Sequence, residues 1–459
     1  MKILHLVAGE LSGGAAKGAL NLHNALLNLG IDSHILTTAK DTLNKANIST
    51  LNKYKAFFYA KIDSSISRIC GSENIFSNNF FGFNILKHQS YKNADIIHLH
   101  WVNSGFISLR NIALINKPII WSIRDMWAFS GGCHYAIANN NLCFKYQTSC
   151  KSCPALVPRF KILKNLALFN QHIKIKSYPK NLHFVGISNW ISECLRQSMI
   201  AKNAPISTIF NCIDESEFTP IDKKIARQIL QINTNKKIIL CGANAPNDFY
   251  KGFGHFIKAL SFLPKEKYYL CFFGKLDERL IPCGFEFKNF GYHNSVIALR
   301  TIYSAADVFV APSLLDAAPK TIMESLACKT PVVAFDNSGG SDIIKHKISG
   351  YLAKFDSVDD LANGVKWIIC ANNYDEISHQ ARQSILEQFS AKNIAKQYIA
   401  LYEKIAESAK ITNGGGQYEI IIAKFAESAV DSANNSSQIN LTPQALEKSA
   451  INGEFRYVA

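Results

Sequence analysis

The stretch from Asp316 to Glu324 places two carboxylates eight positions apart around a predicted helix start. A β-branched run that ends at Pro312 precedes it, as is typical of a buried parallel strand. Pro319 suits the first helical position, where its missing N–H costs nothing, and the free amides of residues 320–322 would point toward solvent or an anion. A phosphate could bind there with the help of the helix dipole.

The two carboxylates fit a nucleotide-sugar ligand chemically. Glu324, about one turn into the helix, could accept hydrogen bonds from a ribose diol, and Asp316 on the preceding loop could hold hydroxyls of a sugar. The alternative is a loop aspartate and a solvated helical glutamate, because a pair at this spacing is common. The rest of the sequence is needed to choose between a nucleotide-sugar site and two ordinary surface carboxylates.

Length and composition indicate a soluble enzyme-sized protein. The chain has 459 residues, 48% of them hydrophobic, which suits two or three domains. No apolar run approaches the roughly 20 residues needed to span a bilayer, and the apolar stretch after Lys2 is broken by Gly9 too early for a signal peptide. We therefore expect a cytoplasmic protein whose twelve cysteines are mostly reduced thiols.

The net charge of +15 lies entirely in the first half, where residues 1–213 contain 23 Lys+Arg and 8 Asp+Glu. The basic residues are dispersed and no nucleic-acid motif is present, so nucleic acid is not an expected partner. We expect an anionic membrane surface as a partner, because basic residues frame an apolar stretch at roughly helical spacing. The alternative is a solvated basic helix. These residues are Arg159, Lys161, Lys164, Lys174, Lys176 and Lys180.

Strand-like runs alternate with helix-length segments in both halves of the chain, which predicts two doubly wound, Rossmann-like α/β domains facing a cleft. We expect domains at 1–213 and 214–390, a helix over 391–410 that crosses back to the first domain, and a linker and tail of unknown role at 411–459. The expected strands are 2–8, 32–38, 95–101, 118–123 and 182–187, then 237–242, 268–274, 307–312 and 331–335. Ligands bind in such folds at the carboxyl ends of the strands.

Several short motifs occur in a specific order over residues 1 to about 410. They are Ser12–Ala15, His98–Trp101, Asp125–Tyr135, Asn211 with Asp214, Lys251–Gly252, and Pro312–Ser313 running on through Asp316, Glu324 and Pro331. In this order and spacing the chain resembles the retaining GT-B glycosyltransferases of glycosyltransferase family four, particularly bacterial enzymes that build capsular, exopolysaccharide or lipopolysaccharide repeat units.

The resemblance implies a donor site in the second domain. Glu324 would bind the ribose of the donor nucleotide, and Asp316 would contact the sugar near its reacting carbon. Lys251 would neutralise the diphosphate leaving group, with Lys320 and Thr321 beside it. Since an ammonium and helix-terminal amides can meet that charge, no cofactor or divalent metal is expected for catalysis.

In the first domain, Gly13 and Gly14 would let the backbone approach the donor closely, in conformations that glycine tolerates. Arg124 stands where the family frequently has a His that contacts the donor sugar, so it joins Lys251 and Asp316 as a catalytic candidate. Two further departures concern the donor site. Asp316 replaces the usual Glu, and no arginine occurs at 242–245, shortly before the lysine.

The acceptor would bind to the first domain. His98 and His100 fall on one face of a strand by period two, and His100 lies nearer the cleft. Trp101 or Trp127 could stack on a sugar face, and Asp125 completes the candidate acceptor site with His100 and Trp101.

A dense group of cysteines follows, with His134 beside it. Four thiols within 21 residues, including a C-x-x-C pair, could hold a structural zinc, although the spacing fits no standard zinc module. Bridged or free thiols are the alternatives. This cysteine cluster consists of Cys133, Cys143, Cys150 and Cys153.

These observations together predict a membrane-peripheral enzyme at the inner face of the cell membrane. It would transfer a hexose or related sugar from a UDP- or GDP-sugar to a lipid-linked oligosaccharide, and the resemblance implies that the transfer retains the anomeric configuration. A sugar-nucleotide epimerase or hydrolase on the same fold is one alternative. A non-catalytic scaffold subunit is another, for which Arg124 and the absent arginine are the motivating observations.

Overall fold

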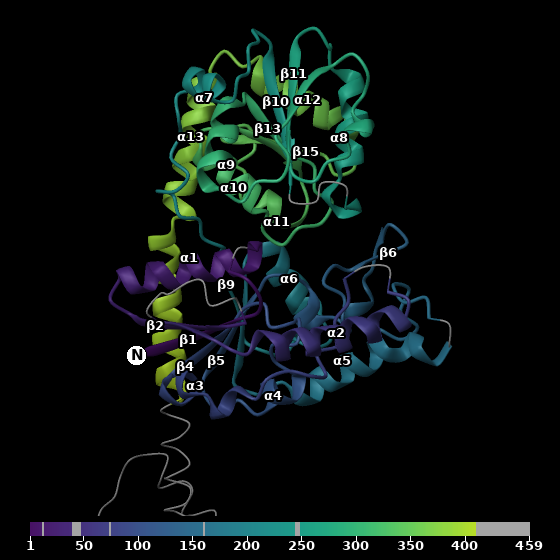
Figure 1. Cartoon of the computed structure of the whole chain (residues 1–459), viewed down its shortest axis with the longest axis vertical. Coiled ribbons are helices and arrows are strands. Elements are labelled where there is room, and N and C mark those ends of the chain that lie inside the picture. The colour runs from purple at the N-terminus through teal and green to yellow at the C-terminus, as the bar shows by residue number, and fades with distance from the viewer. Residues whose placement is uncertain (12, 39–46, 73–74, 159–160, 244–247, 410–459) are drawn as a thin grey trace, which may run out of the picture. The chain divides into compact units, whose positions relative to one another are not determined.

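A computed structural model describes residues 1–409 except 12, 39–46, 73–74, 159–160 and 244–247 (Figure 1). The expectations for the tail at 411–459, for Arg159 and for part of the 242–245 segment lie outside the described residues. Met1–Tyr402 form one compact unit. No helix of the described part of the chain is long and apolar enough to cross a membrane.

The first sheet has seven parallel strands in the order β3-β2-β1-β4-β5-β8-β9. Its strands are β1 (Lys2–Val7), β2 (Asp32–Thr37), β3 (Ile48–Thr50), β4 (Ile96–Leu99), β5 (Ile119–Ile123), β8 (Leu182–Gly186) and β9 (Ile206–Thr208). Every residue of β4 and β5 is buried, as expected where helices cover both faces of a parallel sheet. The five strands predicted for this half are confirmed to within two residues, whereas β3 and β9 were not predicted.

The second sheet has six parallel strands in the order β12-β11-β10-β13-β14-β15. They are β10 (Lys237–Gly242), β11 (Tyr268–Phe273), β12 (Glu286–Asn289), β13 (Val308–Ala311), β14 (Val332–Phe335) and β15 (Gly350–Ala353). The four predicted strands are confirmed. A short antiparallel pair, β6 (Ile137–Ala138) and β7 (Asn141–Leu142), stands apart from both sheets.

Helices flank both sheets. Around the second sheet, α8 (Phe253–Ala259) and α12 (Val358–Ile369) lie on one face, and α9 (Val296–Ala305), α10 (Lys320–Ala327) and α13 (Tyr374–Gln388) lie on the other (Figure 1). In the first half the helices are α1 (Gly14–Asn28), α2 (Lys53–Ile69), α3 (Gln89–Asn93), α4 (Leu109–Ala113), α5 (Leu166–Ser177) and α6 (Asn189–Gln197). In the second half they are α7 (Lys223–Ile229), α8 (Phe253–Ala259), α9 (Val296–Ala305), α10 (Lys320–Ala327), α11 (Ser338–Ser341), α12 (Val358–Ile369) and α13 (Tyr374–Gln388).

A last helix covers residues 391–409. Two of its tyrosines reach buried groups of the first sheet: the Tyr398 hydroxyl lies 2.6 Å from Ser122 Oγ, and the Tyr402 hydroxyl lies 2.7 Å from His98 Nδ1. All four side chains are buried, so these hydrogen bonds tie residues 398–402 to β4 and β5.

Candidate active site

A cavity of about 540 Å³ is lined by loops that follow the strands of both sheets. The carboxyl ends of β1, β4 and β5 supply one wall, and those of β10 and β13 supply the other, as is usual for ligand sites in parallel α/β folds. From the first sheet come Gly13, Gly14, Trp101, Arg124, Asp125, His134 and Tyr135, and from the second come Lys251, Asp316, Lys320 and Thr321. Nine of these eleven residues were predicted as site residues; His134 and Tyr135 were not.

The wall from the second sheet carries an ion pair between Lys251 and Asp316. Lys251 Nζ lies 2.6 Å from Asp316 Oδ2, and both side chains are partly exposed to the cavity. The backbone arranges this pair: Leu314 N–H donates to Tyr250 O at 2.8 Å, which draws the loop before Lys251 against the end of β13. Gly252 is required there, because it has a φ of +67° and a Cβ on it would lie 1.8 Å from the carbonyl oxygen of Pro312.

The start of α10 forms the same wall. The helix begins at Lys320, with Pro319 as its N-cap, so the prediction that Pro319 is the first helical residue was wrong by one position. Lys320 and Thr321 line the cavity, and the amides of the first helical turn together with the helix dipole favour an anion there. This geometry supports the predicted phosphate site.

Glu324 lies behind this wall and is not among the residues that line the cavity. Its carboxylate is buried, accepts a hydrogen bond from the Tyr303 hydroxyl at 3.1 Å, and lies 3.4 Å from Lys320 Nζ. The nearby carboxylate and burial raise the pKa of Tyr303 well above its usual value, burial being the larger cause, so Tyr303 stays a proton donor. In this arrangement Glu324 positions Lys320, and a direct contact with a ribose stays a prediction.

The wall from the first sheet is built around Asp125, directly after β5. Its carboxylate accepts three hydrogen bonds: from Trp101 Nε1 at 2.9 Å, from the amide of Trp127 at 2.9 Å and from His134 Nδ1 at 2.6 Å. The other ring nitrogen of His134 lies 2.9 Å from Ser77 Oγ. Because both of its oxygens already accept hydrogen bonds, Asp125 fixes the positions of Trp101 and His134 at the cavity wall.

Gly13 and Gly14 lie at the start of α1, and no atom lies within 4 Å of where their Cβ atoms would be. Gly13 has a φ of −68°, so the prediction that these positions need a conformation special to glycine was wrong at Gly13. The absence of side chains serves instead to leave space beside the helix start.

His100 does not reach the cavity, which corrects its predicted place in the acceptor site. It is buried with His5 and His98, and its Nε2 lies 2.9 Å from His5 Nδ1. Burial, and the positive charge of Arg124 nearby, lower the pKa of all three histidines well below the usual value, so the rings are neutral. Period-two spacing correctly put His98 and His100 on one face, but that face packs against helix 391–402.

Those three histidines are also the one group in the described part of the chain whose potential metal ligand atoms all lie within 4.8 Å of one another. His98 uses both ring nitrogens on hydroxyls, at 2.7 Å from Tyr402 and 2.7 Å from Ser122. Arg124 donates to His100 Nδ1 at 3.4 Å. Since a cation already lies against the cluster, we assign it to supporting Arg124 and not to metal binding.

Tyr135 was not predicted because its role depends on a partner far along the chain. Its ring stacks on that of Tyr250 with centroids 4.2 Å apart, so the stack joins the loop after β5 to the loop before α8. Burial, and next the negative charge of Asp316, raise the pKa of Tyr135 well above its usual value. The phenol therefore keeps its proton beside the Lys251 and Asp316 pair.

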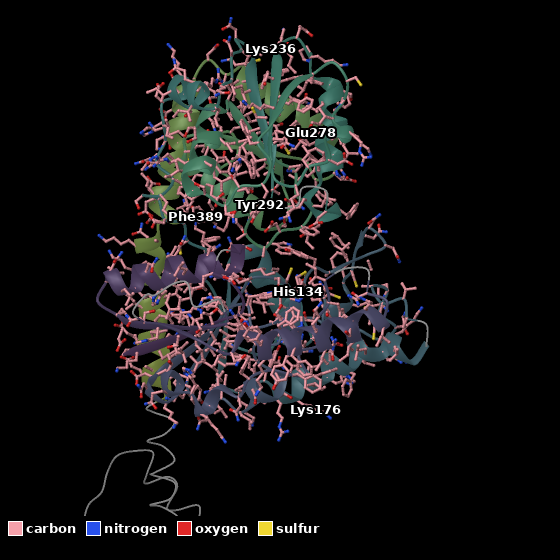
Figure 2. The ribbon with its side chains drawn as sticks, viewed as in Figure 1. His134, Lys176, Lys236, Glu278, Tyr292 and Phe389 are labelled. Carbon is pink, nitrogen blue, oxygen red and sulfur yellow. The ribbon has the colours of Figure 1, made fainter. Side chains whose placement is uncertain are left out.

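Lys174 was predicted to meet an anionic membrane surface with the other basic residues of 159–180 or, in the alternative, to be solvated, and the structure corrects both for this residue. This side chain on α5 is buried, and its ammonium donates to the carbonyl oxygens of Trp127 and Ser130 and lies over the Trp127 ring. Burial lowers its pKa to about 7. Lys174 thus anchors the 127–130 loop between Asp125 and His134, whereas Lys176 is exposed at the far side of the first-sheet lobe from His134 (Figure 2).

The cysteine cluster lies beside this loop, with all four thiols free. Cys133 and Cys153 share a thiol hydrogen bond that, as its largest cause, lowers the pKa of Cys153 to about 7. The cysteines do not form a group with three thiols within 4.8 Å of one another, so the predicted zinc site stays a prediction.

Two Rossmann-like sheets with a ligand-sized cavity at the carboxyl ends of both define the GT-B class of fold. Residues 12–217 match the family described as Glycosyltransferase Family 4, and residues 222–384 match Glycosyl transferases group 1. The chain belongs to the group 1 glycosyltransferases of family four, as the motifs predicted.

Relatives agree with this assignment. An uncharacterised glycosyltransferase of Methanocaldococcus jannaschii is 32% identical over 106 residues, which is 23% of this chain and 27% of that protein. The chain thus matches only about a quarter of that relative's length. The UDP-Gal:alpha-D-GlcNAc-diphosphoundecaprenol alpha-1,3-galactosyltransferase of Escherichia coli is 20% identical to this chain. The alignment covers 85% of this chain and 93% of that enzyme. The crystal structure of Anabaena HepE with UDP and glucose has a TM-score of 0.59 and 15% identity, covering 88% of this chain and 99% of that one, and so shares the fold.

Proposed function

We propose that this protein transfers a hexose-type sugar from a UDP- or GDP-sugar to a lipid-linked oligosaccharide during surface polysaccharide biosynthesis, with retention of configuration. The observation that carries the proposal is the pairing of Lys251 and Asp316 across from Arg124 and Asp125 in one cavity. Relatives named for colanic acid biosynthesis and for transfer to diphosphoundecaprenol-linked sugars support the class of acceptor.

The donor diphosphate binds at the wall from the second sheet. Lys251, Lys320 and the first amides of α10 meet the charge that develops on the phosphate oxygens as the bond to the anomeric carbon breaks. Asp316, held by Lys251, accepts hydrogen bonds from hydroxyls of the sugar. The acceptor hydroxyl approaches from the wall with Trp101, and its proton passes to the departing phosphate, so the reaction needs no metal or dedicated nucleophile.

A lipid-linked acceptor requires the protein to meet a membrane surface, and α2 offers the face for it. Tyr54, Phe57 and Phe58, at i, i+3 and i+4, are 75%, 63% and 62% exposed, so their rings project from one face of the helix into solvent. Lys53 and Lys61 lie over the Tyr54 and Phe57 rings. Exposed aromatic rings flanked by lysines suit the interface of an anionic membrane, which supports the proposal that the enzyme works at the cytoplasmic side of the membrane.

The test is nucleotide release from a panel of UDP- and GDP-sugars, with and without a lipid-linked acceptor extract. The proposal predicts release of UDP or GDP that depends on the acceptor. Equal release without acceptor would instead indicate a hydrolase, and isomerised donor an epimerase. A folded preparation that binds no nucleotide sugar in calorimetry would leave the scaffold alternative.

A further inference from the structure

Arg124 is the cationic side chain of the cavity that lacks an acidic partner. Three cationic side chains line the cavity in the described part of the chain, and two of them face carboxylates: Lys251 faces Asp316 at 2.6 Å, and Lys320 faces Glu324 at 3.4 Å. No carboxylate of the described residues lies within 4 Å of the Arg124 guanidinium.

The partners that Arg124 does have are neutral. Nη1 donates to Asn211 Oδ1 at 2.5 Å and Nη2 to the neutral His100 at 3.4 Å, whereas Nε is buried and has no hydrogen-bond partner. Burial lowers the pKa of Arg124, yet a guanidinium keeps its proton in proteins. A guanidinium has five N–H donors, and these two bonds use one on each Nη atom, so each Nη keeps a second N–H. A charge that is partly removed from water is unfavourable unless an anion completes its surroundings.

The surroundings are built to hold this guanidinium in place. A Cβ on Gly18 of α1 would lie 2.4 Å from Arg124 Nη1 and 2.7 Å from Asn211 Oδ1, so only glycine leaves room for the pair. Beneath it, His100, His5 and His98 are held in neutral form. His100 and His5 share a hydrogen bond, and the His98 ring packs against both of them and is hydrogen-bonded to the Tyr402 hydroxyl. This support fixes the charge at the cavity wall.

We propose that Arg124 binds a carboxylate on the transferred sugar, which makes the donor a nucleotide-linked hexuronic acid. This inference rests on the proposed function. The donor diphosphate already has Lys251, Lys320 and the amides of α10 on the opposite wall, and the sugar must lie between that wall and the acceptor. A guanidinium matches the planar geometry of a carboxylate. A neutral sugar would instead shield the Arg124 guanidinium from water without supplying a negative charge.

The experiment measures binding of UDP-glucose, UDP-glucuronic acid and UDP alone by calorimetry, and repeats it with GDP-mannose, GDP-mannuronic acid and GDP. We expect the wild-type protein to bind the acidic donor about 10- to 100-fold more tightly than its neutral counterpart, the range for a hydrogen bond to a charged group. Arg124→Gln should abolish that preference while leaving the affinity for the free nucleotide unchanged, and Arg110→Gln, at an exposed position of α4, should retain it.

Three results would overturn the inference. Equal binding of neutral and acidic donors by the wild-type protein would do so even if Arg124→Gln failed to fold. An equal loss for both donors and for the free nucleotide in Arg124→Gln would show that Arg124 binds the diphosphate. Unchanged binding of both donors by Arg124→Gln, with weaker binding of the acceptor, would place the anion on the acceptor. In each of these cases, turnover of a neutral donor would leave the proposed function intact. If no donor bound at all, both the proposed function and this inference would be wrong.

Discussion

Replacing Lys251 by Met separates the catalytic role of the ammonium from its role in the fold. Lys251 and Asp316 form an ion pair at 2.6 Å, with side chains 21% and 16% exposed. Because water still reaches both groups, losing the pair should cost only about 1 kcal/mol of folding free energy. Losing a preorganised donor to a developing oxyanion costs about 100- to 1,000-fold in kcat. The variant should therefore stay folded and lose nearly all turnover.

The unpaired Asp316 carboxylate in Lys251→Met allows a second comparison. In Lys251→Met, Asp316 faces the donor phosphates without a counter-charge, so the nucleotide should bind more weakly than to the double variant Lys251→Met/Asp316→Asn. Turnover follows from nucleotide release under saturating donor, and affinity from calorimetry with UDP or GDP. Lys258→Met, at an exposed position of the adjacent α8, is the matched control and should behave as the wild-type protein. A fall in kcat below tenfold, or weaker nucleotide binding by the double variant than by Lys251→Met, would refute this reasoning.

Three further predictions concern features outside the donor site. Phe57→Ser/Phe58→Ser should abolish flotation with vesicles that contain anionic lipid, because it removes the exposed rings of α2, whereas Phe262→Ser, exposed in the second half of the chain, should not; unchanged flotation of the double variant would contradict the membrane role. The pKa of Lys174 is about 7 when folded against a usual 10.5, so the unfolded chain binds more protons between these values and the free energy of unfolding rises with pH. Urea titrations from pH 7 to 9 should show a contribution of at most about 1.4 kcal/mol per pH unit that Lys174→Met lacks, and parallel profiles for the two proteins would count against it. Elemental analysis of protein purified without chelators should find one zinc per chain at the cysteine cluster; zinc-free folded protein, or no loss of zinc in Cys150→Ser/Cys153→Ser, would rule that out.

Local sequence patterns were enough to predict the fold and the wall from the second sheet. The β-branched runs before Pro312 and after Pro331 are typical of buried strands, and both are strands in the structure. Pro319 between them indicated where the helix begins. Lys251 and Asp316 came from motifs, and the structure brings them together as an ion pair on one wall of the cavity, while their roles toward the donor stay predictions. The strands that were not predicted are short or lie at sheet edges, where an alternating pattern has too few residues to show.

The wall from the first sheet was harder to predict because it depends on contacts distant in sequence. Lys174 looked like a surface lysine until the carbonyl oxygens of the 127–130 loop gave it buried partners. The strand face that His100 shares with His98 is occupied by Tyr402, some 300 residues later, which bonds to His98, and the Tyr135 stack needs Tyr250. The signal at Arg124 was present in the sequence as a departure from its relatives, but its lack of an acidic partner is visible only in the structure.

The central claim, that this cavity moves a sugar from a nucleotide to a lipid-linked acceptor, is tested most directly by following the sugar itself. Donor labelled in its sugar, incubated with the full-length protein and membrane extract, should transfer label into solvent-extractable lipid-linked product. The account predicts that wild-type protein and Lys258→Met form this product and that Lys251→Met does not. Label that stays with the nucleotide or appears as free sugar with folded wild-type protein, or equal transfer by Lys251→Met, would contradict it.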